Sequence, residues 1–390
     1  MGKALVPENV LTNMTSTQLN TQAKDFCFRW RGNFLSDDAI AALRETDVLS
    51  HIADPNKRPH EIYRASFDLL HAMGSVDLAT AVGLTMHQYT LGTIATVPIP
   101  DEESRQKRDQ FLGVIREEKL LCAVSSFDMT FQPDGTIKAG LNATMADGKW
   151  IVSGHKRYQS MASVADILFF TAAISDKSFG LFYVSLKDNP NLVLGNSPNT
   201  AFMKATDTRS IAFNHVSIPS HQLVSVTDLD TTTQFHAYSL SWFQSLIPAA
   251  YLGAARTALE ICTRRVASTP GADGVDRALR HESGIGRMNL QLRSALTLRH
   301  GAEAALGAIH TDTAAALDAF AATAEVLKYT GTQVASAIVS QVRHVGGLAV
   351  MVDDSPFARI SEYVQYGALH PRSNSDLESV SGRNALSGQD

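Results

Sequence analysis

Side chains able to do chemistry are numerous in this sequence, but they do not stand in the spacing of a standard catalytic motif. The chain has 390 residues, of which 13 are histidine and 3 are cysteine. No histidine has acidic or cysteine partners at metal-ligand spacing, and the motifs H-E-x-x-H and C-x-x-C do not occur. Neither G-x-G-x-x-G nor a Walker loop is present. We therefore expect no protein-bound metal ion, and generic motifs alone do not disclose a function.

The composition indicates an ordinary globular protein. Hydrophobic residues make up 44% and charged residues 19%, which excludes a disordered tail, a collagen and a coiled-coil rod. The net charge of −5 argues against a nucleic-acid binder, whose surface is normally basic. No run approaches the roughly 20 apolar residues of a membrane helix, and the N-terminus lacks a secretory pattern. Three scattered cysteines make no disulfide framework, so we expect a soluble, cytoplasmic protein.

The elements that must position any functional residues change character twice along the chain. From about residue 18 to 118 the pattern is helical, with an apolar stripe that includes Leu69, Leu70 and Met73. From about 119 to 226 the period drops to two, in runs such as DILFFTAAI and FGLFYVSL separated by turns such as Asp147-Gly148. Six or seven such runs without intervening helices predict an antiparallel β-barrel or sandwich.

After residue 228 the strands end and long, Ala-rich amphipathic segments begin. Alanine and leucine are strong helix formers, and each segment is long enough to form one arm of a bundle. The sequence therefore predicts an N-terminal helical domain over 1–118, a middle β domain over 119–228 and a C-terminal four-helix bundle over 229–390. The fold class is α+β with three domains.

Five phrases, in this order and at these spacings, resemble the acyl-CoA dehydrogenase superfamily. They are GSVDLATAVGLTMHQYTLG, LLCAVSSFDMTF, DGKWIVSGHKRYQSMASVADILFF, IAFNHVSIPSHQLV and HVGGLAVM. Each phrase alone is weak evidence, whereas the ordered set spans nearly the whole chain. The resemblance implies an acyl-CoA-dehydrogenase-like fold, a flavin held between the β domain and the bundle, and a homotetramer assembled through the C-terminal helices.

The resemblance also implies which residues meet the flavin ring. Val124, Ser125 and Ser126 match the loop that faces the polar edge of the ring. Tyr158 and Ser160 match the Trp and Thr that flank it. An aromatic side chain supplies a stacking surface and a hydroxyl supplies a hydrogen bond. The two serines could also be plain polar residues at a strand end.

A glycine pair and an arginine match the positions that contact the rest of the cofactor. Gly346 and Gly347 match the loop that approaches the adenosine or pyrophosphate of a neighbouring subunit's cofactor, because glycine lets the backbone come close to a phosphate. The pair could also be only a helix C-cap. The family's R-x-x-F-G phrase is absent, and Arg264 or Arg265 could substitute for it. FAD is the expected cofactor, with FMN as the alternative.

The departures from the family pattern bear on the reaction. Family dehydrogenases remove a substrate proton with a carboxylate. The alignment puts His370 where the C-terminal Glu should be, and puts Phe243 at the alternative base position on the first bundle helix. Gln244 stands where many members carry an Arg that helps to hold CoA. With these residues a dehydrogenase would need another base, such as Glu362.

The same departures resemble the flavin-dependent monooxygenases built on this fold. Their histidines and serine match His370, His87 and Ser160 here. An oxygenase needs a dry cavity and a donor that orients the substrate, which a histidine of near-neutral pKa provides. His87 could equally be a core histidine with satisfied hydrogen bonds, and Trp242 could line the cavity or belong to the core.

The sequence therefore predicts a flavin-dependent oxygenase, similar to the group D monooxygenases, that uses O₂ on a small aromatic or CoA-thioester substrate. The source of its electrons, including a separate flavin reductase, stays open. Two alternatives remain. One is an acyl-CoA dehydrogenase or desaturase with an atypical base, and the other is a non-catalytic relative that keeps the fold as an assembly partner.

Overall fold

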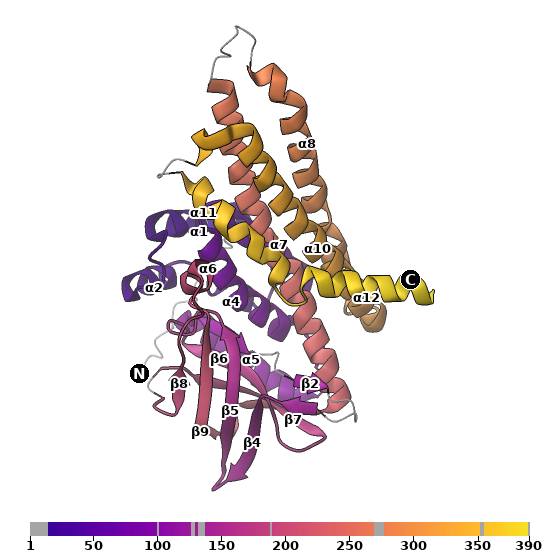
Figure 1. The fold of residues 1–390 in the computed structure, drawn as a ribbon. Helices are drawn as coiled ribbons and strands as arrows, with labels where there is room; N and C mark the ends of the chain where they lie inside the picture. The colour runs from indigo at the N-terminus through magenta and orange to yellow at the C-terminus, as the bar shows by residue number, and fades with distance from the viewer. Residues whose placement is uncertain are drawn as a thin grey trace, which may run out of the picture.

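The computed structural model describes residues 15–388, apart from 100, 126–128, 132–136, 188, 269–276 and 352–354. The elements fall into helices, then strands, then helices, as the sequence predicts (Figure 1). The sequence also predicts strands without intervening helices, but in the described part of the chain the short helix α6 (Ala201–Ala205) and the 3₁₀ turn η2 (Ser220–Gln222) lie among them. The last N-terminal helix ends at Glu118 and the first strand begins at Cys122. The last strand ends at Asp228, and the first helix of the bundle begins at Leu229.

Five α-helices and one 3₁₀ turn form the described N-terminal region. They are α1 (Ser16–Trp30), α2 (Asp37–Arg44), η1 (His51–Ala53), α3 (Pro59–Gly74), α4 (Leu78–Thr96) and α5 (Glu102–Glu118). Nearly every residue of α4 is buried, polar ones such as His87 and Gln88 included, so this helix lies inside the molecule. It therefore forms a wall that both the strands and the C-terminal helices can pack against.

The middle region is a mixed sheet. Its strands are β1 (Cys122–Ser125), β4 (Leu141–Ala146), β5 (Lys149–Gln159), β6 (Ile167–Ala173), β7 (Ser178–Ser185), β8 (Leu192–Leu194), β9 (Arg209–Pro219) and β10 (Leu223–Asp228), with β2 (Met129–Phe131) and β3 (Ile137–Ala139) forming a separate pair. The strand order is β10-β7-β6-β4-β5-β9-β8, and β1 joins at β6. Most pairs are antiparallel, but β1–β6 and β4–β6 are parallel. The sequence predicts an antiparallel domain, and the two parallel pairs depart from that prediction. The period-two alternation marks a buried face but does not fix strand direction.

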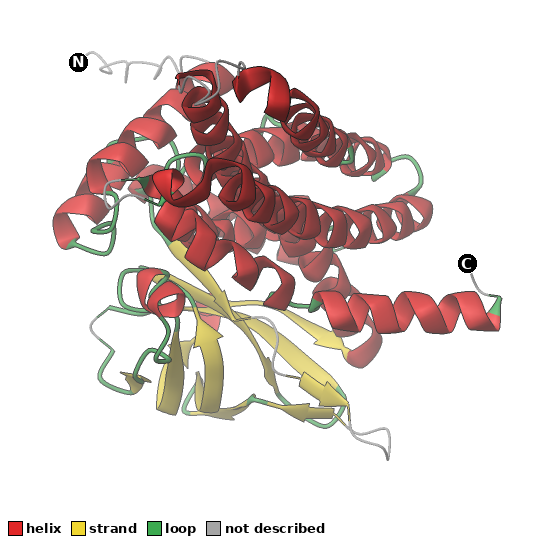
Figure 2. Ribbon diagram, turned by 45° about the horizontal axis from the view of Figure 1, so that its top comes forward, coloured by secondary structure: helices red, strands yellow, loops and turns green. Residues whose placement is uncertain are grey.

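Long helices make up the C-terminal region. They are α7 (Leu229–Ser268), α8 (Arg277–Thr297), α9 (Arg299–Ala308) and α10 (Thr313–Gly346). Shorter elements follow: η3 (Gly347–Val350), α11 (Pro356–Tyr363), η4 (Val364–Leu369) and α12 (Asn374–Ser387). Figure 2 shows the helices gathered on one side of the strands, with α7 reaching down to the sheet in Figure 1. Among the described residues, no helix is long and apolar enough to cross a membrane.

A reciprocal pair of glycines lets α3 and α7 cross closely. A Cβ on Gly253 would lie 2.1 Å from the backbone oxygen of His71, and a Cβ on Gly74 would lie 2.1 Å from that of Ala250. Neither distance leaves room for a side chain. Alanine at either position would force these two helices apart.

Two polar connections hold the sheet to the N-terminal helices. Asp166, the residue before β6, accepts hydrogen bonds from Arg44 of α2 at 2.7 and 2.8 Å and from the backbone N–H of Leu121 at 2.9 Å. On α4, His87 Nδ1 accepts from the backbone N–H of Cys122 at 3.0 Å. Both connections fix the chain where it enters β1.

Candidate active site

A cavity of about 430 Å³ lies where α4, the end of β5, the short helix α6 (Ala201–Ala205), α7 and η4 meet. The volume falls within the range of small-molecule sites. The cavity is lined by Val82, Met86, Tyr89, Arg157, Tyr158, Gln159, Ser160, Phe202, Met203, Thr206, Thr208, Leu240, Phe243, Tyr366, Leu369, His370 and Pro371. Four of the residues expected from the sequence are therefore brought together: Tyr158, Ser160, Phe243 and His370.

His370 follows η4 and is surrounded by aromatic rings. Its Nε2 lies 2.7 Å from the hydroxyl oxygen of Tyr251 on α7. The imidazole meets the ring of Phe243 edge-on, with centroids 5.9 Å apart, and lies 6.3 Å from the ring of Phe202. These contacts leave the imidazole little freedom to turn.

Burial keeps both members of this pair uncharged. Desolvation, followed by the positive charge of Lys328, lowers the pKa of His370 from 6.5 to about 3. Burial raises the pKa of Tyr251 well above 10. Because the Tyr251 phenol stays protonated and has no other acceptor among the described residues, it donates to Nε2 of His370. The proton of the neutral imidazole then sits on Nδ1, which can donate to a ligand in the cavity.

A short chain of hydroxyl groups forms another part of the cavity lining. Ser160 follows β5 and Thr208 precedes β9, and these strands pair at Gln159 and Arg209. The Ser160 hydroxyl lies 2.9 Å from that of Thr208, which lies 2.8 Å from that of Thr206. Thr206 in turn donates to a backbone oxygen of α6. Because Thr206 donates to the backbone, Thr208 donates to Thr206 and Ser160 donates to Thr208. The Ser160 oxygen can then accept a hydrogen bond from a ligand.

The backbone bends at the cavity wall. Tyr158 has a φ of 57°, in the left-handed region that few non-glycine residues adopt, and the β5–β9 register shifts between Lys156 and Gln159. The Tyr158 side chain is 65% exposed. Gln159 Oε1 is buried and has no hydrogen-bond partner among the described residues. The bulge therefore brings the ring of Tyr158 and the Oε1 atom of Gln159 to the same cavity.

Aromatic side chains from four separate elements form the remaining walls. Phe243 of α7 meets Tyr89 of α4 edge-on at 5.2 Å. Phe202 of α6 stacks on Tyr366 of η4 at 4.5 Å, with an angle of 21° between the rings. Apolar walls of this kind exclude water and suit a flat ring.

These residues fit a flavin ring. Its flat tricycle needs apolar faces, which the aromatic walls supply, and its polar edge needs hydrogen-bonding groups. Ser160, Thr208 and the Oε1 atom of Gln159 provide such groups at one side of the cavity. Among the described residues, no group of metal-ligating side chains gathers anywhere.

His87 does not line this cavity. It is 0% exposed, and its Nε2 lies 2.9 Å from the backbone oxygen of Leu49 while Nδ1 accepts from Cys122. Both ring nitrogens are therefore occupied by the backbone. Its position on α4 fixes the start of β1, the strand whose other end carries Val124 and Ser125.

Two further residues expected near the substrate belong to the core. Trp242 is 0% exposed and packs edge-on against Tyr63 and Phe320, with centroids 5.8 and 5.9 Å apart. Gln244 is 1% exposed and does not line the cavity. Adjacent residues of a helix point about 100° apart, so only Phe243 of this trio reaches the cavity.

The residues expected to contact the rest of the cofactor lie elsewhere. Arg265 is 22 residues beyond Phe243 on α7, which is about 33 Å along a helix. Gly346 ends α10, and Gly347 caps it with a φ of 62°. None of the three lines the cavity.

The residues at the end of β1 were expected to face the flavin. Val124 and Ser125 are the last residues of that strand, although their side chains are outside the described set. Ser126 lies outside the described residues altogether. The expectation that these three residues face the flavin stays a prediction.

Several residues that line the cavity or contact its lining were not identified from the sequence. Tyr251 follows Phe243 by eight residues, just over two helical turns, so helical spacing alone indicates neighbouring faces. Thr206 and Thr208 stand two residues apart just before β9, and this is the spacing of side chains on one face of a strand. Phe202 and Tyr366 meet only through the tertiary fold, and no local signal marks them.

Comparison with families of known proteins gave no matching family model. A putative acyl-CoA dehydrogenase, YdbM of Bacillus subtilis, is 26% identical over 47% of this chain and 46% of its own length. Isobutylamine N-hydroxylase of Streptomyces viridifaciens is 23% identical over 59% of each chain. This chain thus spans about half the length of the curated relatives that it matches.

Solved structures match over nearly the full length. FMN-bound TdsC, a dibenzothiophene monooxygenase from Paenibacillus sp. A11-2, superimposes with a TM-score of 0.79 at 16% identity, over 96% of this chain and 97% of that one. Butyryl-CoA dehydrogenase from Megasphaera elsdenii gives 0.75 at 15% identity, over 96% and 99%. At such identities the likeness concerns the fold, and it confirms the fold expected from the five ordered phrases.

Proposed function

We propose that this chain, which has the acyl-CoA dehydrogenase-like fold, is a flavin-dependent monooxygenase. The observation that carries the proposal is the chemistry of the cavity. His370, which the sequence alignment puts at the position of the dehydrogenase carboxylate, is held neutral against Tyr251. No Asp or Glu is among the described residues that line the cavity. A neutral imidazole of pKa about 3 is a poor proton acceptor but a good hydrogen-bond donor.

Each group in the cavity has a role under this proposal. A bound reduced flavin would supply the electrons that activate O₂. His370 donates from Nδ1 to the substrate or to oxygen, and Tyr251 holds the imidazole in the tautomer that can do so. Ser160 orients the polar edge of the flavin through its hydroxyl chain. Phe243 and Phe202 exclude water and position the substrate's apolar surface.

The substrate class that we propose is small and largely apolar, with an aromatic ring as the best fit. Among the described lining residues the charged side chain is that of Arg157, which is exposed at the rim. A CoA thioester stays an alternative, since its nucleotide lies outside the acyl cavity. The names of two relatives, a dibenzothiophene monooxygenase and an isobutylamine N-hydroxylase, support an oxygenase.

The alternative is an acyl-CoA dehydrogenase with an atypical base, which the names of the other two relatives favour. Glu362, the replacement base considered from the sequence, is exposed on α11 and does not line the cavity. Another described carboxylate would have to move into the cavity for this reaction. The alternative therefore needs a rearrangement that the oxygenase does not.

A single set of experiments separates the two reactions. The purified protein is titrated with FAD and with FMN, and the flavin spectrum reports binding; FAD is our proposed cofactor and FMN the alternative. The reduced complex is then mixed with ¹⁸O₂ and a panel of small aromatic substrates. Label in the product supports the oxygenase. Anaerobic bleaching of the oxidised flavin by an acyl-CoA identifies the dehydrogenase instead, and a protein that ignores both flavins is the non-catalytic relative.

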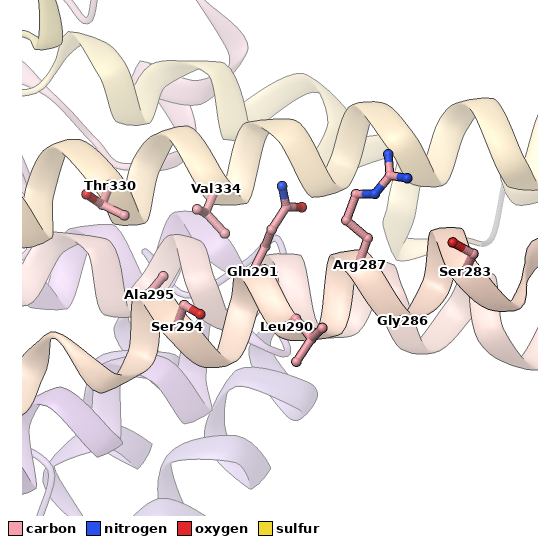
Figure 3. A pocket seen from close by; sticks show the side chains of 9 residues that line it. All are labelled: Ser283, Gly286, Arg287, Leu290, Gln291, Ser294, Ala295, Thr330 and Val334. Carbon is pink, nitrogen blue, oxygen red and sulfur yellow. The ribbon is translucent and has the colours of Figure 1, made fainter.

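We also propose that the chain assembles into a homotetramer through its bundle. A groove of about 630 Å³ runs between α8 and α10. Figure 3 shows Arg287 and Gln291 pointing from α8 toward α10, while Leu290 points away from it. Leu290 is 62% exposed, and the small residue Gly286 lies one helical turn before it. An exposed apolar side chain next to a small one suits close contact with another helix, and closed symmetric assemblies are the usual result.

A further inference from the structure

A lysine is buried in the bundle beside the candidate site, and so far it has entered only through the effect of its charge on the pKa of His370. Lys328 of α10 is 0% exposed. Lysine is seldom fully buried unless its ammonium group is paired or hydrogen-bonded. Its Nζ donates to Asn374 Oδ1 at 2.6 Å and to the backbone oxygen of Ala368 at 3.4 Å. Both acceptors belong to the segment that carries His370.

The two acceptors lie on either side of His370 in the chain. Ala368 is in η4, two residues before it, and Asn374 begins α12, four residues after it. One ammonium group therefore ties down both ends of the turn that holds the imidazole. Hydrogen bonds from a charged donor are roughly twice as strong as those between neutral groups.

Further contacts hold the rest of this turn. Asn374 donates through Nδ2 to the hydroxyl of Thr332, one turn along α10 from the lysine, at 3.2 Å. Gly367 packs between Thr332 and Tyr251, since an added Cβ would lie 3.1 Å from each. The turn is thus held by α10 on one side and by the helix that supplies Tyr251 on the other.

We propose that Lys328 is a positioning residue for His370: through Ala368 and Asn374 its ammonium group fixes the turn that carries the imidazole into the cavity. The proposal deepens the proposed function and rests on His370 acting there. Lys328 does not line the cavity, so it acts through the turn. A displacement of about 1 Å at a reacting group can cost on the order of 100-fold in rate.

The charge of Lys328 also bears on His370. The titratable groups around the two residues are Tyr251 on α7, Tyr366 on η4 and Asp376 on α12. Burial lowers the pKa of Lys328 to about 8, against the opposing effect of Asp376. Below pH 8 the lysine is charged and binds the turn strongly, and above it the hydrogen bonds weaken.

The test begins with Lys328→Met, which keeps the volume and removes both hydrogen bonds and the charge. We expect kcat to fall by about 10- to 100-fold with KM changed less than threefold. In the unaltered enzyme kcat should also decline above pH 8, and this alkaline limb should vanish in the variant. An unchanged kcat in a folded Lys328→Met protein overturns the proposal.

Two substitutions at the other end of the hydrogen bond separate positioning from packing. Asn374→Asp keeps an acceptor and adds a negative charge, so it should retain kcat within about threefold and move the alkaline limb to higher pH. Asn374→Leu should lose kcat as Lys328→Met does, and it gives the test if the lysine variant does not fold. Ile338→Ala, a buried change on the same helix, is the matched control and should lower stability without moving the limb. A limb unmoved by Asn374→Asp contradicts the proposal.

One measurement does not depend on the reaction. Exchange of the histidine C2 hydrogen, followed by mass spectrometry of the peptide that contains His370, reports the pKa and exposure of that residue. Lys328→Met should raise the pKa of His370 and speed its exchange, even if the enzyme proves not to be an oxygenase. Identical exchange in the two proteins refutes the positioning role, whatever reaction is catalysed.

Discussion

The hydroxyl oxygen of Tyr251 lies 2.7 Å from Nε2 of His370, and neither group is charged at neutral pH. The tyrosine comes from the first bundle helix and the histidine from the turn after η4, 119 residues later. A phenol that donates to one imidazole nitrogen leaves the other nitrogen protonated. The pair therefore makes His370 a hydrogen-bond donor toward the cavity, which suits oxygen chemistry better than removal of an α-proton.

Replacing Tyr251 tests this assignment of the proton. Tyr251→Phe keeps the ring and leaves Nε2 of His370 buried without its donor. This should lower the free energy of unfolding by about 1–3 kcal/mol, and the imidazole proton is no longer confined to Nδ1. We expect turnover to fall by about 10- to 100-fold while the flavin still binds, since geometry is retained but the proton is misplaced. Steady-state rates and flavin titration measure the two effects. Tyr329→Phe removes a half-buried phenol of α10 that donates to Glu378, outside the cavity; it is the control and should leave the rate unchanged.

Replacing His370 tests the role of the imidazole itself. His370→Ala should slow product formation by about 10²- to 10⁴-fold, the usual worth of such a group, and divert reducing equivalents to hydrogen peroxide. His370→Glu restores the dehydrogenase carboxylate and should not improve the native reaction, because a carboxylate lacks the donor proton. Product and hydrogen peroxide are measured in the same assay. Faster turnover in His370→Glu would contradict the oxygenase.

The fold was largely predictable because its signals are local. Alternation with period two marked the strands, and Ala-rich amphipathic runs marked α7 to α10. Strand direction was not predictable, since the parallel pairing of β1 with β6 joins residues 45 positions apart, such as Cys122 and Ile167. Nothing in a strand's own sequence records which neighbour it will meet or in which direction.

The candidate site was predictable only in part, for a related reason. Tyr158, Ser160, Phe243 and His370 stand at matched positions of a known family, and the structure gathers them around one cavity. His87 has the same residue type as a site histidine, but its two backbone hydrogen bonds arise from tertiary contacts with Leu49 and Cys122. Tyr366 enters the site through a packing arrangement that no spacing encodes.

The groove between α8 and α10 gives a prediction about assembly. Leu290→Asp places a charge on the exposed apolar face of α8, where burial in an interface would be costly. We expect the unaltered protein to be a tetramer at micromolar concentration and the variant to shift toward dimers or monomers, as measured by light scattering. Leu386→Asp, at an exposed position near the end of α12, is the matched control and should leave the mass unchanged. A monomeric unaltered protein would disprove the tetramer.

Buried histidines make the stability of the fold depend on pH. Among the described residues, burial lowers the pKa of His51 and His370 to about 3 and that of His71, His87 and His236 to about 4. When the pH falls below about 6.5, the usual pKa of histidine, these side chains bind protons in the unfolded chain but stay neutral in the folded chain. The free energy of unfolding should therefore be highest above pH 6.5 and fall as the pH drops toward 4, by about 1.4 kcal/mol per pH unit for each histidine.

His87→Gln isolates one of these histidines. Glutamine keeps uncharged polar groups near Leu49 and Cys122 but reproduces their geometry imperfectly, so the variant should be less stable at pH 7 by about 1–2 kcal/mol. It has no proton to gain, and its loss of stability between pH 6.5 and 4 should be smaller by about 3 kcal/mol, the worth of a shift from 6.5 to about 4. The two unfolding curves, measured in urea at each pH, should therefore cross as the pH falls. His155→Gln, at an exposed position, should leave the slope unchanged, and parallel curves for His87→Gln would show that burial of this imidazole does not govern the acid response.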